Sequence, residues 1–319
     1  MKNPFHALNT FSATLIERAD TWLVRVDTGR RPTSGVVYAV DAERALVVTA
    51  AHTLPSREGL SVARGKGAGT PATLLGYDPR TDLALLSTAP EGLTAAPFAD
   101  SDTARVGHMV LTLGRPGAAV RATLGLVSAV GDAWQTGFGG DVARFFDIDG
   151  RLPEGFSGGA LLDVDGRVLG VNTHALVRGG TTLPTETVRR VCDAIAVKGH
   201  VPQGHLGLGT QPAHLPPDAA EIAGQKGGLV VIHVEPEGPA ARAGLGLGDV
   251  LLGLDGRAVE HHTALIAARD FAAGRTVTAR VLRAGEVREV PFEVGERAPD
   301  PPGGGHGRCC GGRRGGFCR

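Results

Sequence analysis

The sequence predicts a mainly β protein with two folded units and a tail. Short β-branched stretches bounded by turn residues recur at 36–40, 46–50, 73–76, 83–87, 109–113, 122–130, 160–164 and 167–172. Regularly spaced strands without intervening helical patterns indicate a barrel or a sandwich, and the pattern alone does not choose between them. The composition agrees, since 48 glycines and 20 prolines with 4% aromatic residues favour short strands and turns.

Length and charge set the class of protein. The chain has 319 residues, of which 42% are hydrophobic, so it can bury sizeable cores. Its 33 basic residues balance 33 acidic ones, and a chain without bulk positive charge is not expected to bind nucleic acid. We see no apolar run of the roughly 18 residues that cross a bilayer, so no membrane span is predicted.

The first 22 residues have the pattern of an amphipathic helix. Apolar side chains recur at steps of three and four, at Phe5, Leu8, Phe11, Leu15, Ala19 and Trp22. This apolar face either packs on the unit that follows or makes a contact between subunits. The segment 1–22 lacks the continuous apolar stretch and cleavage site of a signal peptide.

A glycine-framed serine, Ser157, precedes a strong hairpin signal, the Asp165-Gly166 turn. A serine hydroxyl is a poor nucleophile, so chemistry here needs a base beside it and backbone N–H groups facing the developing oxyanion. Gly155 allows a sharp turn that brings its own N–H and that of Ser157 to one point. By itself, the stretch is equally consistent with a Gly/Ser turn before a strand.

Two upstream stretches supply a base and a group to orient it. His52 ends the apolar run 46–52, and Asp82 lies in the stretch 76–86. Histidine is the usual general base near neutral pH, and a buried carboxylate fixes its tautomer. Asp78 competes with Asp82 for this role, but the spacing to the Leu-Ala-Leu-Leu run favours Asp82. The order His52, Asp82, Ser157 matches chymotrypsin-like enzymes.

The motifs T-A-A-H, D-P-R-T-D-L-A-L-L, G-F-S-G-G-A-L and G-V-N-T resemble those of HtrA-type trypsin-like serine proteases, over roughly residues 20–295. The resemblance implies a chymotrypsin-like double antiparallel β-barrel over 23–197. It also implies a serine endopeptidase that needs no cofactor and cleaves unfolded polypeptides through an acyl-enzyme, as well as a homotrimer built from N-terminal contacts. The competing interpretation is an inactive chaperone or binding scaffold.

Two residues near Ser157 need separate comment: Phe156 departs from the pattern of the family, and Arg151 is a candidate for setting specificity. Phe156 stands where HtrA-like relatives have Asn and secreted relatives have Asp, and it cannot accept the ammonium group of a cleaved N-terminus. Arg151, six residues before Ser157, matches the base of the primary specificity pocket in chymotrypsin-like enzymes. An arginine there would favour an acidic substrate residue. Alternatively its guanidinium points outward or pairs with Asp149 or Glu154.

The second unit begins after a predicted helix at 184–197, which Thr185 is expected to cap. Residues 204–295 resemble a PDZ domain, through G-H-L-G-L-G and G-L-V-V-I-H-V-E-P-E-G-P-A. In that case N–H groups around Leu206, Gly207 and Leu208 receive the carboxylate of C-terminal peptides, whose last residues add a strand. The alternative is a closed β module that binds nothing.

The remaining predictions concern cysteines, histidines and the tail. Residues 296–319 have the composition of a disordered tail that holds Cys309, Cys310 and Cys318, with spacing that fits no standard zinc site. Cys192 lies alone in the barrel unit, so no internal disulfide is possible there. This favours a reducing compartment, and we expect a cytoplasmic location. His174 has no partner motif and is interpreted as a packing or surface residue.

Overall fold

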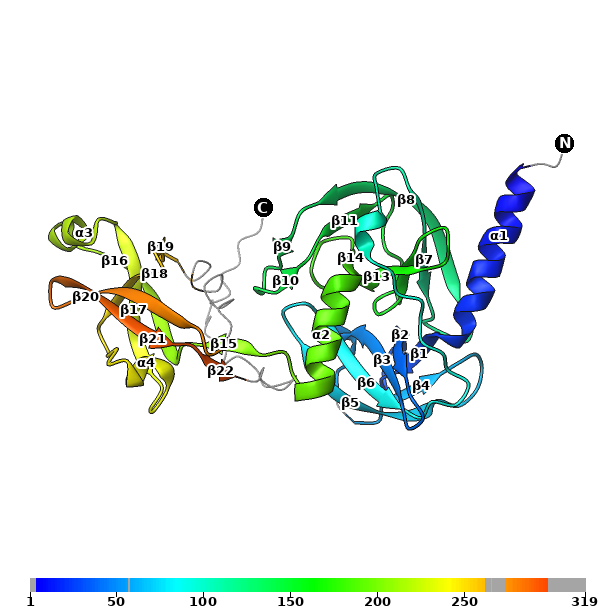
Figure 1. Ribbon diagram of the computed structural model, residues 1–319, viewed down its shortest axis with the longest axis horizontal. Helices are drawn as coiled ribbons and strands as arrows, with labels where there is room; N and C mark the ends of the chain where they lie inside the picture. Colours follow the sequence, from blue (N-terminus) through cyan, green and yellow to red (C-terminus); the bar gives the residue numbers. More distant parts are fainter. Residues whose placement is uncertain (1–3, 57, 262–264, 266–272, 298–319) are drawn as a thin grey trace, which may run out of the picture.

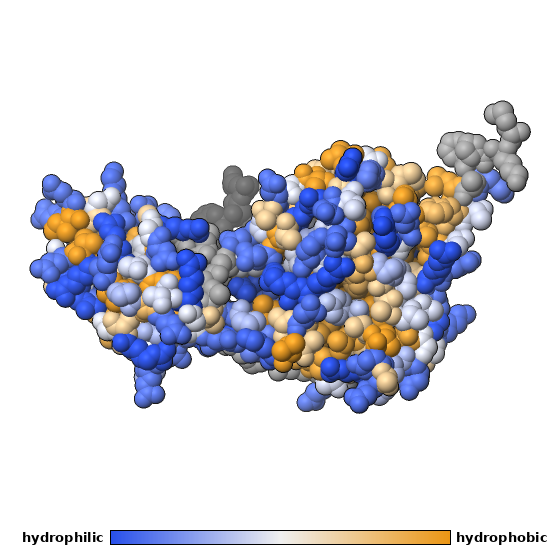
Figure 2. Space-filling model, in the orientation of Figure 1, coloured by the Kyte–Doolittle hydropathy of each residue, from blue (hydrophilic) through white to orange (hydrophobic). Residues whose placement is uncertain are grey.

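The computed structural model describes residues 4–56, 58–261, 265 and 273–297. Figure 1 shows a larger body that contains the N-terminus and a smaller body, joined by helix α2 and strand β15. We call residues 23–198 the barrel region and residues 203–297 the C-terminal region. On the face seen in Figure 2, apolar surface gathers mainly on the barrel region.

The first half of the barrel region is a closed barrel in the strand order β1-β2-β3-β6-β5-β4. Its strands are β1 (Leu23–Asp27), β2 (Thr33–Val40), β3 (Ala45–Ala50), β4 (Ser61–Ala63), β5 (Thr70–Asp78) and β6 (Leu83–Thr88). A short 3-10 helix η2 (Ala51–Thr53) follows β3. β3 is buried at every position, so it forms part of the core of this barrel.

The second half is an antiparallel sheet in the order β11-β8-β7-β12-β13-β14. Its strands are β7 (Met109–Gly114), β8 (Arg121–Gly131), β11 (Phe145–Ile148), β12 (Ala160–Leu162), β13 (Val168–Thr173) and β14 (Thr181–Pro184), with the small pair β9 (Trp134–Gln135) and β10 (Asp141–Val142) beside it and η3 (Ser101–Thr103) before it. The predicted Asp165-Gly166 hairpin is confirmed, because β12 pairs with β13 and Gly166 has φ of 80°.

The N-terminal helix is observed as α1 (Pro4–Arg18), followed by η1 (Ala19–Thr21). Its C-terminal part packs on the barrel region: Leu15, Ala19 and Trp22 are buried, and Leu15 approaches the turn at Gly166. The first turns of α1 project away from the barrel region (Figure 1), and Phe11 is 43% exposed. One end of the predicted apolar face therefore has an intramolecular partner, and Phe11 remains exposed.

Helix α2 (Thr185–Lys198) closes the barrel region and buries Val188, Val191, Cys192 and Ile195. The prediction that Thr185 caps it is wrong. Pro184 occupies the N-cap position, and Thr185 is the first helical residue, whose hydroxyl donates to the carbonyl of Val168 instead. The helix ends at Gly199, which has the positive φ of 76° that favours glycine.

The C-terminal region is a sheet in the order β16-β17-β18-β20-β21, with β19 beside β18. Its elements are β15 (Gln203–His205), β16 (Leu208–His214), α3 (Pro217–Ala223), β17 (Gly227–Val234), α4 (Pro239–Arg242), β18 (Val250–Leu254), β19 (Arg257–Ala258), β20 (Thr276–Arg283), β21 (Glu286–Glu293) and β22 (Gly295–Arg297). β15 pairs with β22, which brings the two ends of this region together. The helix predicted at 263–272 lies largely outside the described residues.

Candidate active site

His52 and Asp82 meet at the ends of two paired strands. β3 and β6 are antiparallel, with Ala50 opposite Leu83, so the residues just beyond these ends are neighbours. His52 Nδ1 lies 2.7 Å from Asp82 Oδ2, and the His52 backbone N–H donates to Asp82 Oδ1 at 2.7 Å. The Asp82 side chain is 5% exposed, whereas that of His52 is 36% exposed. Because a carboxylate only accepts, the His52 proton lies on Nδ1 and Nε2 is free to accept one.

Asp78, the competing candidate, does not face His52. It is fully buried, accepts a hydrogen bond from the Thr81 hydroxyl at 2.8 Å, and lies 3.5 Å from the Arg80 guanidinium. The carboxylate that pairs with the candidate base is therefore that of Asp82, as the spacing predicts.

Ser157 makes its side-chain hydrogen bond to a residue that the sequence analysis set aside. Its Oγ lies 2.9 Å from His174 Nδ1, and His174 Nε2 lies 2.7 Å from the carbonyl oxygen of Leu152. The interpretation of His174 as a packing or surface residue is wrong, because its imidazole bridges Ser157 and Leu152. In the described part of the chain, Ser157 Oγ has no hydrogen bond to His52.

Thr173 links the two halves of the site. Its hydroxyl donates to Asp82 Oδ2, and it precedes His174 in the chain. The backbone places Thr173 and His174 beside Ser157, because Gly158 N–H donates to Asn172 O and Asn172 N–H donates to Gly159 O. His52, Asp82 and Ser157 thus belong to one connected site, and Thr173 is a contributor that sequence reasoning missed.

The loop before Ser157 carries the two N–H groups that are predicted to bind an oxyanion. Gly155 has φ of 82°, and within the described residues neither its N–H nor that of Ser157 donates a hydrogen bond. The Ser34 hydroxyl fixes the loop from behind: it donates to Gly155 O at 2.7 Å and accepts from Arg115 N–H at 2.7 Å. The carbonyl of Ser157 accepts from the Thr33 hydroxyl at 2.7 Å. Two backbone donors are thereby left available.

Phe156 anchors the same loop by packing. Its ring is 1% exposed and lies against Gly114 of β7, where an added Cβ would approach the ring to 2.5 Å. An apolar contact therefore holds Phe156 in the loop. Gly114 has no side chain, and this absence makes room for the ring.

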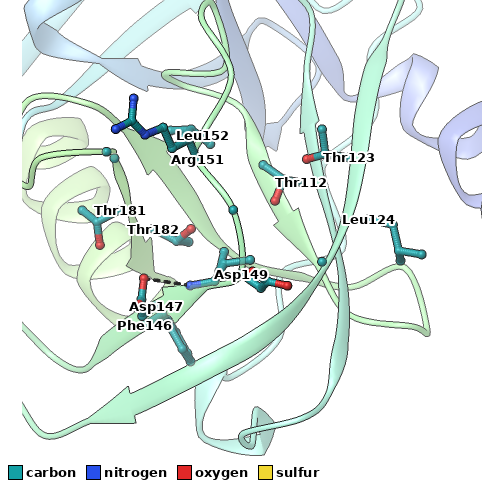
Figure 3. A pocket seen from close by; sticks show the side chains of 15 residues that line it. Thr112, Thr123, Leu124, Phe146, Asp147, Asp149, Arg151, Leu152, Thr181 and Thr182 are labelled. Atoms are coloured by element: carbon teal, nitrogen blue, oxygen red, sulfur yellow. Dashed lines mark hydrogen bonds between the residues drawn. The ribbon is translucent and has the colours of Figure 1, made fainter.

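Arg151 lies at the edge of a cavity of about 200 Å³ behind the loop. Polar side chains line much of it, among them Thr112, Thr123, Thr181 and Thr182. In Figure 3 the Arg151 guanidinium points away from Thr112 and Thr123. Arg151 is exposed, and it forms no ion pair with Asp149 or Glu154 within the part of the chain that the structure describes. Its effect on specificity stays a prediction.

In the C-terminal region, the predicted carboxylate-binding turn lies at the start of an edge strand. Leu206 and Gly207 are buried, and Gly207 has φ of 72°. Their carbonyls accept from Ala240 N–H at 3.0 Å and Glu235 N–H at 2.9 Å, while their own N–H groups donate to nothing among the described residues. Leu208 begins β16, the outer strand of its sheet.

Comparisons with known proteins agree with this arrangement. A trypsin-like peptidase domain matches residues 33–171, and a PDZ domain matches residues 204–294. The fold and site therefore define a trypsin-like peptidase domain followed by a PDZ domain. The solved structure of the HtrA-type protease AlgW with a tripeptide is 32% identical, with a TM-score of 0.62 over 91% of this chain and 98% of that one. The serine endoprotease from Yersinia pestis is 27% identical, with a TM-score of 0.63 over 89% of this chain and 97% of that one.

The curated relatives are longer. Periplasmic serine endoprotease DegP from Escherichia coli (strain K12) is 32% identical over 272 residues, which cover 82% of this chain and 56% of that protein. A probable periplasmic DegP-like serine endoprotease from Halomonas elongata is 32% identical over 278 residues, with the same shares covered. The chain thus spans about half the length of these relatives. It belongs to the family of HtrA-type serine proteases with a PDZ domain.

The names of these relatives contradict the expected cytoplasmic location, because they are periplasmic proteins. The cysteine argument fails for a physical reason. Cys192 is fully buried, and burial raises the pKa of its thiol, so this inert cysteine is compatible with an oxidising compartment as well. Among the described residues, no helix is long and apolar enough to cross a membrane.

Proposed function

We propose that this protein is a serine endopeptidase that hydrolyses peptide bonds through an acyl-enzyme. Ser157 Oγ attacks the carbonyl carbon of the substrate while His52 Nε2 takes its proton, and Asp82 stabilises the resulting imidazolium. The N–H groups of Gly155 and Ser157 bind the oxyanion. His52 then protonates the departing amine, and water hydrolyses the acyl-enzyme by the reverse sequence of proton transfers.

The observation that carries this proposal is the His52–Asp82 pair, with its buried carboxylate bonded to both the imidazole and the backbone of His52. A binding scaffold has no need for a carboxylate-oriented imidazole whose other nitrogen is free. Membership of the HtrA-type family and the free N–H groups at Gly155 and Ser157 support the same assignment. Unfolded polypeptides are the proposed substrates.

The test is cleavage of unfolded casein by the full chain and its Ser157→Ala variant. Removing the nucleophile of such a triad costs about a millionfold in turnover, so the variant is expected to be inactive while remaining folded. Fluorophosphonate labelling of Ser157 is a parallel measurement, since it requires an activated serine. Activity of Ser157→Ala within tenfold of the wild type would show that Ser157 is not the nucleophile. A wild-type chain that neither cleaves casein nor reacts with the probe would favour the inactive binding scaffold.

The PDZ domain is proposed to bind C-terminal peptides and to adjust this activity. Support comes from the turn at 206–208 next to the outer strand β16 and from relatives whose solved structures contain peptides. A peptide amide should bind more weakly than the acid, since each charge-assisted bond contributes about 1.5–3 kcal/mol. Equal affinity for acid and amide would argue against recognition of a terminal carboxylate.

Two further properties follow from the family. We propose a periplasmic location, on the names of the curated relatives.

We also propose a homo-oligomer, with the trimer as the first candidate, since Phe11 on the projecting part of α1 is exposed. Sedimentation of the wild type and of Phe11→Ser would test this: an unchanged assembly would exclude Phe11 from the contact.

A further inference from the structure

The hydrogen bonds around His174 define its tautomer. A backbone carbonyl only accepts, so the proton of a neutral His174 lies on Nε2 and is donated to Leu152 O at 2.7 Å. Nδ1 is then an acceptor, and Ser157 Oγ–H donates to it at 2.9 Å. The hydroxyl proton that the proposed mechanism transfers to His52 is thus directed to a different imidazole.

The two imidazoles differ in the group behind them. A proton taken by His52 creates an imidazolium that faces the carboxylate of Asp82. A proton taken by His174 would create one that faces the neutral carbonyl of Leu152. A carboxylate stabilises an imidazolium far better than a carbonyl does. His174 is therefore suited to bind the resting hydroxyl but is the poorer proton acceptor during reaction.

The position of His174 also matters for access to the serine. Its imidazole spans from Leu152 to Ser157, the two ends of the loop that carries the proposed oxyanion donors. Leu152 is itself held on the opposite side, because its N–H donates to Gly179 O at 3.2 Å and its side chain packs against Gly180. The Ser157 hydroxyl is therefore already engaged by this imidazole when a substrate carbonyl approaches it.

We infer that His174 is a restraining residue: its imidazole holds the Ser157 hydroxyl away from His52, and a substrate must displace it before acylation. This inference rests on the proposed function, in which Ser157 is the nucleophile. It assigns a regulatory contact to the same site. The resting and reactive states then differ by the exchange of one hydrogen bond and a rotation of the Ser157 and His174 side chains.

The test is the rate of Ser157 labelling by a fluorophosphonate probe in the full chain. His174→Ala is expected to raise this rate, and kcat/KM for a short peptide, by about 2- to 12-fold, which corresponds to one neutral hydrogen bond. His52→Ala should abolish both. The matched control is His108→Ala: His108 is exposed in the barrel region, and its imidazole makes no hydrogen bond to the described residues, so its loss should leave the rate unchanged.

Two kinetic outcomes would overturn the inference. A slower His174→Ala variant, together with residual activity in His52→Ala above that of Ser157→Ala, would make His174 a proton acceptor. A His174→Ala rate equal to the wild-type rate would mean that the contact does not restrain the serine. If His174→Ala does not fold, His174→Phe, which keeps a planar ring but cannot accept the hydroxyl proton, is measured in the same way.

Nitrogen NMR of the imidazoles gives a second readout that does not depend on activity. The wild type is expected to show His174 protonated on Nε2, with an Nδ1 resonance that shifts in Ser157→Ala because the donor is lost. Protonation on Nδ1 in the wild type, or an unshifted resonance, would refute the inference. Absence of labelling in both the wild type and His174→Ala would instead count against the proposed function, and the NMR result would still decide on the contact.

Discussion

The two halves of the barrel region hold their parts of the site differently. The first barrel fixes His52 through both its backbone and its side chain, and both bonds end on the buried Asp82 carboxylate. The second half carries Ser157, whose carbonyl accepts a hydrogen bond from Thr33 of the first barrel and whose hydroxyl bonds to His174. The proposed base is therefore held by two hydrogen bonds, whereas the hydroxyl of the proposed nucleophile bonds to an imidazole other than that of His52. Under the inference drawn for His174, exchange of a hydrogen bond regulates the half that carries Ser157.

The largest expected effect comes from breaking the organised half. Asp82→Asn keeps the shape of the side chain, but its amide can hold His52 in the wrong tautomer and no longer balances the imidazolium. We expect kcat to fall by about 10⁴-fold, as in chymotrypsin-like triads. Steady-state kinetics on a peptide substrate measures this. A loss below tenfold would show that the buried carboxylate is not the orienting group.

A second substitution tests the contact between the halves. Gly158 has φ of 79°, and an added Cβ would clash with the carbonyl of Ser34. We expect Gly158→Ala to lower the free energy of unfolding by about 1–3 kcal/mol, because a non-glycine residue is strained at that φ and the strands must separate. Urea unfolding measures the change. Gly117→Ala is the control, since the space around Gly117 is open and its φ is not positive. Equal stability of the two variants would contradict the packing described for Gly158.

A smaller effect is expected from loosening the nucleophile loop. Ser34→Ala removes the hydroxyl that donates to Gly155 O, so the proposed oxyanion donors lose one support. We expect kcat to fall by about 2- to 12-fold with KM little changed, the range for one hydrogen bond of 0.5–1.5 kcal/mol. Ser34→Thr retains the hydroxyl and should restore part of the rate. An equal loss in both variants would point to packing rather than the hydrogen bond.

The smallest effect is expected at Asp20, whose carboxylate pairs with Arg64 and Arg115. Hydrogen bonds from Arg64 and Arg115 hold the pKa of the Asp20 carboxyl below its usual range. Its stabilising contribution is therefore complete above the unfolded pKa and is lost as the pH falls through the lower folded pKa. Because the Asp20 side chain is 46% exposed, Asp20→Asn should cost below about 1 kcal/mol at neutral pH. Urea unfolding at pH 7 and at about pH 3 should show a smaller difference between the variant and the wild type in acid.

Much of the fold follows from local patterns in the sequence. The strands predicted at 46–50 and 83–87 are observed as β3 and β6, because alternating or continuous β-branched residues between turns leave few other structures. The contact between His52 and Asp82 was predictable too, because the motifs place His52 just after one strand and Asp82 just before another. These features depend on residues close in the chain.

The features that the sequence did not reveal depend on distant groups. Ser34 contacts Gly155, and Thr173 contacts Asp82, across more than ninety positions of chain. His174 could have been noticed, because it directly follows the G-V-N-T motif beside the predicted serine strand. Its choice of Ser157 as a partner, however, depends on the carbonyl of Leu152 at the right distance. No local pattern encodes that distance.

The packing of Phe156 against Gly114 bears on whether activation of the protein is reversible. A protease whose active-site loop forms around a newly cut N-terminus is switched on once, since peptide-bond cleavage is not undone. Here a phenyl ring and the Ser34 hydroxyl hold the loop, and neither contact involves a chain terminus. Under the proposed function, each molecule would therefore pass between resting and working forms many times, and its output would follow the present supply of substrate rather than a past cut.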